Sequence, residues 1–450
     1  WAEIRPEIRR NFAQLWQRPE LGNMEFAAAA TLGDWLAGHG FAVERGLCGL
    51  ATAFRARAGA GAPRVAVLAE YDALPGTDNA AVPARQRRGG RAGHACGHNQ
   101  IGPANCGAAI AAAAAARELG LPGEIVVLGT PAEEIVWGKV ALLKLGAFDG
   151  IDALLTSHGD YQNGALARPC QAVVSGEVVY LGESGHGGSI RRSNALDGAE
   201  LAVQSIERLR AHHFPDVSVE HVLRRGGEIP NVTPDEARLW LTARHGELGR
   251  AREVYDFAIG VARQAAEVTG LGFRHQFIAA TRGYLPNEAL ARHLHAALSI
   301  VGPPRWTDPG LGFMRELAAA CRPGGGFTLH EGIGYYDRGL DPYGQDDGEA
   351  SWRIPLGRIN WAFPEQIPLH HWALTALAGH EAGHPGPLMA SEALAIGIVG
   401  LLADAATVEK AKAELRGRTR GIALGEPEVG ALRTMRDDPA AFWDASWIEP

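Results

Sequence analysis

Three short apolar runs, each followed within a few residues by side chains that can bind a metal ion, constrain this chain most. Residues 64–72 read RVAVLAEYD, residues 124–128 read EIVVL before a pair of glutamates, and residues 151–156 read IDALLT before a histidine. Continuous apolar runs of this length are typical of parallel strands buried on both faces. Helical patterns separate the runs, which predicts an α/β fold. Open α/β sheets place their ligand sites at the carboxyl ends of such strands.

The segment HACGHN, residues 94–99, supplies the clearest candidate ligands. It places His94, Cys96 and His98 at alternate positions, and Gly97 allows close approach of the backbone. Neutral imidazole and thiolate are side chains that bind Zn²⁺ and similar divalent ions. The alternative is a buried turn around a hydrogen-bonded cysteine, so a metal site requires further ligands elsewhere.

The carboxylates Glu133 and Glu134 follow the second apolar run. One of them can bind a metal while its neighbour acts as a general base toward the bound water. They are equally compatible with a solvated acidic start of a helix. Asp72 has the position to accept a hydrogen bond from a metal-bound imidazole and so to orient it. His158 follows the third run, where a single histidine is more often a core residue than a ligand.

A last ligand is expected near the end of the chain, where several histidines compete. His370 and His371 lie in a loop flanked by proline, and His380 and His384 follow within fifteen residues. Composition alone does not choose among them. Four arginines between residues 85 and 91 are interpreted as a solvated face, with an electrostatic funnel for an anionic substrate as the alternative.

The pattern changes near residue 172. From there to about residue 280 the periodicity predicts the order β-α-β-β-α-β, which is the ferredoxin-like arrangement. We therefore predict an inserted α+β domain at residues 172–286. The flanking segments 1–171 and 287–450 are predicted to form one discontinuous catalytic domain.

The charge and composition exclude several function classes. A formal net charge of -8 argues against a general nucleic-acid binder. Five scattered cysteines argue against a disulfide framework. The first residues show no signal peptide, and the apolar stretch near residues 393–403 is too short to span a bilayer. We expect a cytoplasmic protein that handles small molecules and binds no membrane.

Taken together, the motifs resemble those of the M20 metallopeptidase family, in its amidohydrolase branch and most of all the aminobenzoyl-glutamate hydrolase group of the B type. Nine segments recur in family order over about 300 residues: AEYDALP (69–75), HACGHN (94–99), GTPAEE (129–134), TSHGD (156–160), SGHGG (184–188), GGEIPNVTP (226–234), YLPN (284–287), DGEASW (347–352) and PLHHW (368–372). The resemblance implies a zinc-peptidase-like catalytic domain and an inserted lid that also forms a homodimer.

The resemblance also implies roles for single residues. It implies that the metal ligands are Cys96 as the bridging ligand, His98, Glu134, His158 and His370. It implies that Glu133 is the general base and that His186 stabilises the oxyanion, often in the site of a partner subunit. Asn231 and Arg244 resemble the pair that holds a substrate carboxylate. Two divalent ions per subunit, Mn²⁺ or Zn²⁺, are implied with them.

The function implied is hydrolysis of the amide bond of a small N-acyl or N-aroyl amino acid by metal-activated water. The alternative is an aminohydrolase of the same fold that releases ammonia from an aromatic amine such as 5-nitroanthranilate. A non-catalytic scaffold would be expected to lose Glu133 or Cys96, and both are present. Asn99, where many relatives have Asp, and Arg191-Arg192 in the lid depart from the family pattern and bear on substrate identity.

Overall fold

The computed structural model describes residues 1–188 and 193–447, which form two compact units. The first unit comprises Trp1–Arg168, Leu285–Gly339 and Ala350–Leu424. The second comprises Pro169–Tyr284, Leu340–Glu349 and the segment that begins at Gly425. Arg191 and Arg192, which the sequence singled out in the lid, lie outside the described residues.

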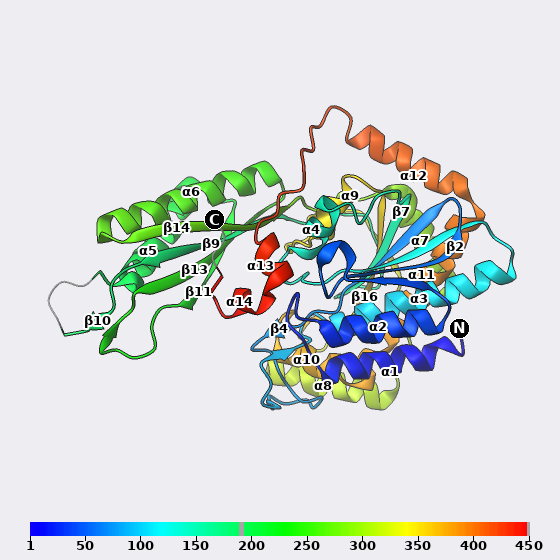
Figure 1. Ribbon diagram of the computed structural model, residues 1–450. Helices are drawn as coiled ribbons and strands as arrows, with labels where there is room; N and C mark the ends of the chain where they lie inside the picture. The colour runs from blue at the N-terminus through cyan, green and yellow to red at the C-terminus, as the bar shows by residue number, and fades with distance from the viewer. Residues whose placement is uncertain (189–192, 448–450) are drawn as a thin grey trace. The chain divides into compact units, whose positions relative to one another are not determined.

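The first unit is built on an eight-stranded sheet in the order β1-β2-β6-β3-β7-β16-β8-β15 (Figure 1). Its strands are β1 (Ala42–Arg45), β2 (Phe54–Ala60), β3 (Arg64–Ala69), β6 (Gly123–Gly129), β7 (Ala153–Asp160), β8 (Gly164–Leu166), β15 (Gly334–Tyr336) and β16 (Leu356–Ala362). The four central strands β6, β3, β7 and β16 run parallel to one another, so their carboxyl ends meet at one edge. Short strands β4 (Leu74–Pro75) and β5 (Ala92–Gly93) form a separate pair.

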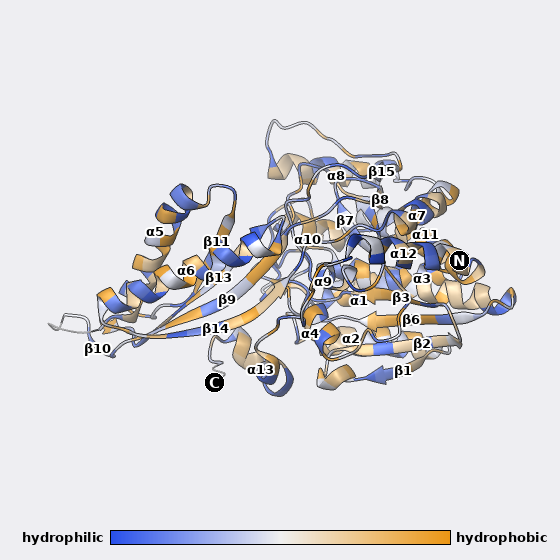
Figure 2. Cartoon of the chain, turned by 90° about the horizontal axis from the view of Figure 1, so that it is seen from above, coloured by the Kyte–Doolittle hydropathy of each residue, from blue (hydrophilic) through white to orange (hydrophobic). Residues whose placement is uncertain are grey.

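Helices pack on this sheet and on one another. They are α1 (Ile4–Gln17), α2 (Phe26–Gly38), α3 (His98–Glu118), α4 (Gly138–Lys144), α7 (Glu288–Val301), α8 (Asp308–Cys321), α10 (Trp372–Ala378), α11 (Pro385–Ala403) and α12 (Ala405–Arg418). Two short 3₁₀ turns, η1 (Leu47–Gly49) and η2 (Glu381–Gly383), complete the unit. One core cluster joins the inward faces of α1, α3, α7 and α11 to β3, β6 and β7. Figure 2 shows the apolar colouring along β3 and β6 that the sequence pattern predicts.

The α/β fold class predicted from the sequence is confirmed, with differences at element boundaries. The helix expected over residues 103–118 begins at His98, so the end of the HACGHN segment forms its first turn. The expected helical region over residues 387–415 is two helices, α11 and α12. They break at Asp404, whose side chain accepts a hydrogen bond from the Ala406 amide and caps α12.

Helix α11 is strongly apolar along its length. Counted from Glu381 to Ala403, these 23 residues are long and apolar enough to cross a membrane, yet 72% of the tested window is buried inside the protein. The helix packs along α3 and α7. It therefore has the character of a core helix, although the helix is longer than the apolar stretch of residues 393–403 seen in the sequence.

The second unit contains a four-stranded antiparallel sheet in the order β11-β13-β9-β14. Its strands are β9 (Ala172–Leu181), β11 (Ser218–Arg225), β13 (Glu236–His245) and β14 (Gly272–Thr281), and its long helices are α5 (Ala195–His213) and α6 (Leu248–Thr269). This is the predicted ferredoxin-like order. A two-residue pair, β10 (Gly185–His186) with β12 (Val232–Thr233), lies beyond the Leu181/Glu236 end of β9 and β13 (Figure 1).

The unit boundaries differ from the predicted domains. Residues 340–349 and 425–447, predicted for the catalytic domain, belong to the second unit. The first segment joins it because the Asp341 amide donates to Pro169 O, and Arg282 pairs with Glu349. The second, with α13 (Leu432–Asp437) and α14 (Pro439–Trp443), brings the Phe442 ring to 5.4 Å from that of Trp240 on β13. Helix α9 (Asp347–Ser351) crosses the boundary between the units.

Candidate metal centre

The carboxyl ends of β3, β6 and β7 deliver the predicted ligands to one place. Asp72 follows β3, Glu133 and Glu134 follow β6, and His158 lies near the end of β7. Cys96 and His98 come from the start of α3, and His370 lies in the loop between β16 and α10. Because the central strands are parallel neighbours, residues far apart in the sequence converge at this edge.

Three groups of side chains each place donor atoms within 4.8 Å of one another. The groups are Cys96 with His98 and His158, Cys96 with Glu134 and His370, and His98 with Glu133 and Glu134. Cys96, His98 and Glu134 each belong to two of the groups. The six residues therefore form one connected set rather than separate sites.

The distances within the set suit shared cations. The Cys96 Sγ atom lies 3.5 Å from His158 Nε2, and His370 Nε2 lies 3.4 Å from Glu134 Oε2. His98 Nε2 lies 3.8 Å from a Glu133 oxygen and 3.9 Å from a Glu134 oxygen. Metal–donor bonds are about 2.0–2.3 Å, so two donors of one ion are separated by up to about 4 Å.

Asp72 holds two of these residues at once. Its Oδ1 atom lies 2.8 Å from His98 Nδ1, and its Oδ2 atom accepts a hydrogen bond of 2.9 Å from the Glu134 amide. The first contact leaves the Nε2 atom of His98 directed at the set. A carboxylate behind a ligating imidazole fixes the ring and raises its basicity. This is the position that the sequence predicts for Asp72.

Burial and charge within the set favour a cation. The His98 Nε2 and Glu134 Oε1 atoms are buried without a hydrogen-bond partner among the described residues. Burial disfavours the charged His98 ring, but Cys96 and Asp72 outweigh this and raise its pKa well above the ordinary value. Burial also raises the pKa of the Cys96 thiol and that of Glu134. Buried polar atoms normally have partners, and a divalent ion satisfies this donor set.

The side chains of Glu133 and Glu134 are only 6% and 5% exposed, so they do not form a solvated helix start. Burial lowers the pKa of His158 to about 4, so its ring is neutral and able to bind a metal.

The backbone is strained at two positions next to the metal set. Ala132 and His370 have φ values of 59° and 56°, a region that non-glycine residues rarely adopt. The His370 amide donates to Ala95 O, which ties the loop of this histidine to the HACGHN segment.

The family model of Peptidase family M20/M25/M40 matches residues 66–340. The chain belongs to this family. It is a metal-dependent hydrolase that acts on C–N bonds, and the predicted M20 resemblance is confirmed.

Three similar proteins illustrate the relationship. The B-type component of p-aminobenzoyl-glutamate hydrolase from Escherichia coli K12 is 29% identical over 434 residues, covering 89% of this chain and 90% of the relative. The aminobenzoyl-glutamate utilization protein of Klebsiella pneumoniae has a similar fold, with a TM-score of 0.58 at 16% identity, over 89% of this chain and 96% of that one. A dinuclear metal-binding M20 peptidase of Bacillus subtilis superposes with a TM-score of 0.54 at 20% identity, over 90% and 99% of the two chains.

His94, the first histidine of the HACGHN segment, does not lie among the metal-binding side chains of this M20 protein. His94 is in none of the three groups formed within residues 1–188 and 193–447. Its Nε2 atom lies 3.2 Å from Leu15 O, and burial lowers its pKa to about 3. His94 therefore ties α1 to the motif as a neutral ring, and of the three candidate ligands in the segment only Cys96 and His98 join the set.

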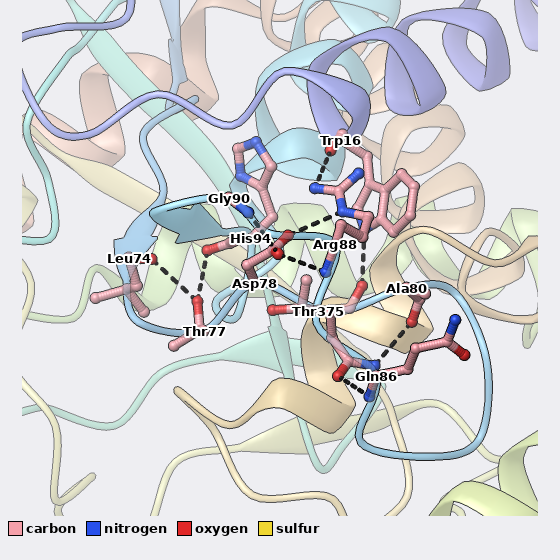
Figure 3. Close-up of polar contacts among 12 residues, drawn as sticks. Trp16, Leu74, Thr77, Asp78, Ala80, Gln86, Arg88, Gly90, His94 and Thr375 are labelled. Atoms are coloured by element: carbon pink, nitrogen blue, oxygen red, sulfur yellow. Dashed lines mark hydrogen bonds and ion pairs between the residues drawn. The ribbon is translucent and has the colours of Figure 1, made fainter.

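The loop before the motif is held by its own polar side chains (Figure 3). Asp78 accepts hydrogen bonds from the Arg88 side chain and from the amides of Arg88 and Gly90. The Arg88 guanidinium also stacks over the Trp16 ring at 4.2 Å. Arg85 donates to Asp78 O and to Asn79. Two of the arginines assigned to a solvated face are thus structural residues of the loop that leads to His94.

Asn99, the departure from the usual Asp, has a structural explanation. Its Nδ2 atom donates to Phe12 O at 3.2 Å and to Ala378 O at 3.0 Å. A carboxylate could not donate either bond. The amide therefore joins the start of α3 to α1 and to the end of α10.

Sequence reasoning missed three buried charged residues around the M20 metal set. Glu70 lies directly after β3, Lys139 lies in the first turn of α4, and Glu25 precedes α2. Glu25 accepts a hydrogen bond from the Ala132 amide, and burial together with the Asp72 charge raises its pKa well above the ordinary value. Only Glu70 carried a signal, because it stands two residues before Asp72 at the end of an apolar run.

An apolar pocket of the first unit adjoins the metal set. Cys96, Gly97 and Gly159 line it on the side of the set. The remaining walls include the polar side chain of Gln100 and small residues, and their large apolar side chains are Trp306, Met314, Trp361, Phe363, Leu374 and Leu377. It encloses about 20 Å³, which is about the room that one water molecule needs. A larger ligand group therefore requires side chains such as Met314 to move.

The second unit carries the three predicted residues that lie outside the metal set. His186 is exposed in β10, and the neighbouring Gly187 amide donates to Asn231 O, so these two residues lie together. Arg244 is near the opposite end of β13, eight residues beyond Glu236. At a rise of about 3.4 Å per residue this corresponds to roughly 27 Å.

The predicted Asn231–Arg244 pair is therefore not assembled within one chain. Arg244 instead pairs with Glu220 across the strands, with Nε 2.8 Å from Oε2. Asn231 and Arg244 are thirteen residues apart in the sequence. They lie far apart in space because most of the residues between them form the extended strand β13. If both residues act on one carboxylate, they must come from two chains.

Proposed function

We propose that this protein hydrolyses the amide bond of a small N-acyl or N-aroyl amino acid that carries a free carboxylate. The observation that carries the proposal is the convergence of one thiol, three imidazoles and two carboxylates from four chain segments, with buried donor atoms that lack partners among the described residues. The Escherichia coli relative is named for hydrolysis of such an amide, and the likeness covers 89% of this chain.

The centre holds two divalent ions in this proposal, and Mn²⁺ or Zn²⁺ both fit the donor set. The Bacillus subtilis protein of the same fold is described as dinuclear, which supports the count of two. Cys96, like His98 and Glu134, belongs to two of the three donor groups, and among these the family resemblance assigns the bridging role to the Cys96 thiolate. When bound, the ions supply a water of lowered pKa and polarise the substrate carbonyl.

The residues of the chain perform the proton transfers. Glu133 is buried, and one of its carboxylate oxygens lies 3.8 Å from His98 Nε2, which places it beside the ligands. It accepts the proton of the attacking water and returns it to the leaving nitrogen. Glu133→Gln keeps the fold and the metal and loses about 10²–10⁴-fold in kcat, the usual contribution of general acid–base catalysis. A variant with wild-type turnover would place the base elsewhere.

Product identity tests the reaction class. Protein loaded with Mn²⁺ or Zn²⁺ is incubated with N-acetyl, N-benzoyl and aminobenzoyl amino acids and, separately, with aromatic amines. Release of the free amino acid, absent in Glu133→Gln, supports the proposal. Ammonia release from the aromatic amines without amide cleavage would overturn it in favour of deamination.

His186, Asn231 and Arg244 are proposed to complete the site in a homodimer. His186 stabilises the oxyanion, while Asn231 and Arg244 bind the substrate carboxylate. His186 and Asn231 lie together and Arg244 lies far from them, so one shared site would take the metal set and Arg244 from one chain and His186 with Asn231 from the other.

Complementation between inactive variants tests this division. After subunit exchange, a mixture of His186→Ala with Arg244→Ala, or with Glu133→Gln, recovers activity because some dimers hold one intact site. A mixture of His186→Ala with Asn231→Ala stays inactive because both changes fall on the same half-site. Recovery in the last mixture, or in none after verified exchange, would contradict the arrangement.

A further inference from the structure

Glu70 is a buried carboxylate beside the metal set that the mechanism above does not use. It is 2% exposed and follows β3 directly, two residues before Asp72. Its Oε1 atom lies 2.8 Å from the Lys139 ammonium, and Lys139 is fully buried. Its Oε2 atom is buried with no hydrogen-bond partner among the described residues.

The unpartnered oxygen faces another unpartnered atom. Glu70 Oε2 lies 3.7 Å from His98 Nε2, and both atoms lack hydrogen-bond partners within the described part of the chain. Two donors that are each about 2.1 Å from one ion can be separated by at most about 4.2 Å. The Glu70 distance is also slightly shorter than those from His98 to Glu133 and Glu134.

We infer that Glu70 is a further residue of the metal centre. Its Oε2 atom holds the ion bound by His98, either directly or through one bound water. Lys139 occupies the other oxygen and so fixes the carboxylate in a one-oxygen mode. The inference rests on the proposed metal centre but not on the proposed substrate.

The charges around the centre support this assignment. Five groups are anionic when metal is bound, and one buried cation accompanies them: Cys96, Glu70, Asp72, Glu133 and Glu134, with Lys139. Glu25 is counted as neutral, because burial and the Asp72 charge raise its pKa well above the ordinary value. Four negative charges remain, which two divalent ions neutralise. The ligand histidines add no charge, because metal-bound imidazole is neutral. A low-dielectric interior strongly favours such neutrality.

Metal titration of four proteins tests the inference. Metal-free wild type, Glu70→Gln, Glu70→Asp and Glu124→Gln are titrated with Mn²⁺ and with Zn²⁺ by calorimetry, and bound metal is counted by mass spectrometry. Glu124 is the matched control, since it is also a buried glutamate paired with a cation, Arg64, but at the amino ends of the same strands.

Glu70→Gln is expected to lower the affinity for one of the two ions by about 10–100-fold. This is the usual effect of removing a residue that supports a metal site. Glu70→Asp keeps the charge and regains part of the affinity, and Glu124→Gln binds as wild type does. Affinities within twofold of wild type for both ions in Glu70→Gln would overturn the inference. Failure of wild type to bind any ion would instead overturn the proposed metal centre.

Two further measurements test the inference if Glu70→Gln does not fold. The double variant Glu70→Gln/Lys139→Gln removes both charges and avoids an unpaired buried ammonium. It is expected to show the same loss of affinity. In a crystal structure of the metal-loaded wild type, Glu70 Oε2 is expected to bind an ion or an ion-bound water. An Oε2 atom more than about 5 Å from both ions would overturn the inference.

Discussion

His94 yields a prediction that separates a structural histidine from a metal ligand. Burial, with the nearby His98 charge, lowers its pKa from 6.5 to about 3, so the folded protein holds a neutral ring that contacts Leu15 O. The unfolded chain takes up this proton as the pH falls. The contribution of His94 to stability is therefore fully present above pH 6.5 and is lost as the pH falls from 6.5 toward 3.

The size of this effect follows from linkage. At pH 5 an unfolded histidine with a pKa near 6.5 is almost fully protonated, and this costs the folded state about 2 kcal/mol relative to pH 8. The figure hardly depends on whether the pKa in the folded protein is about 3 or about 4, because the folded ring is neutral at pH 5 in both cases. His94→Gln keeps a hydrogen-bond donor for Leu15 O, but its side chain does not titrate. The variant therefore does not lose this part of the unfolding free energy at pH 5.

Urea unfolding of the metal-free proteins at pH 8 and pH 5 measures this contribution of His94 to the free energy of unfolding. Between these conditions wild type should lose about 2 kcal/mol more unfolding free energy than His94→Gln. His221→Gln, a change at an exposed histidine of β11, should follow the wild-type profile. His94→Gln should also retain its metal. Equal losses in wild type and His94→Gln, or loss of metal in the variant, would refute the structural role.

Two shorter predictions concern the centre and its pocket. Cys96→Ser should keep the fold, as measured by circular dichroism, but lose bound metal and turnover, because a buried hydroxyl does not replace a thiolate ligand. Full metal content of the variant by mass spectrometry would exclude the bridging role of Cys96. Met314→Ala should widen the pocket beside Cys96 and raise kcat/KM for N-benzoyl relative to N-acetyl substrates by about tenfold or more. An unchanged ratio would place the apolar part of the substrate elsewhere.

The sequence predicted the sheet and its ligand-bearing edge because both depend on local patterns. Apolar runs such as residues 64–69 can only be central strands, and the residues after them must meet at the carboxyl edge. The ferredoxin-like unit was predictable for the same reason, since alternation and helical periodicity are visible within each segment. The HACGHN segment suggested ligands but could not show that His94 turns toward Leu15.

Features that depend on distant contacts could not be predicted from patterns. Nothing in residues 425–447 shows that Phe442 packs on Trp240, so this segment was assigned to the wrong unit. The Asn231–Arg244 spacing carries no information on distance until Glu236–His245 is known to be one continuous strand. The same holds for Asn99, whose amide joins chain segments 87 and 279 residues away.

Lys139 shows the limit most clearly, and it also shows why the centre is organised around a cation. In the sequence GKVALLK the first of the two lysines stands at the start of a short apolar helix, where a surface residue is expected. The fold instead buries it completely against Glu70. A buried ion pair is seldom the most stable choice, because apolar side chains of similar volume avoid the desolvation cost of both charges. The ammonium keeps Glu70 ionised beside three other carboxylates, and an ionised carboxylate with one oxygen unpartnered among the described residues serves, in that position, to bind a metal ion rather than to stabilise the fold.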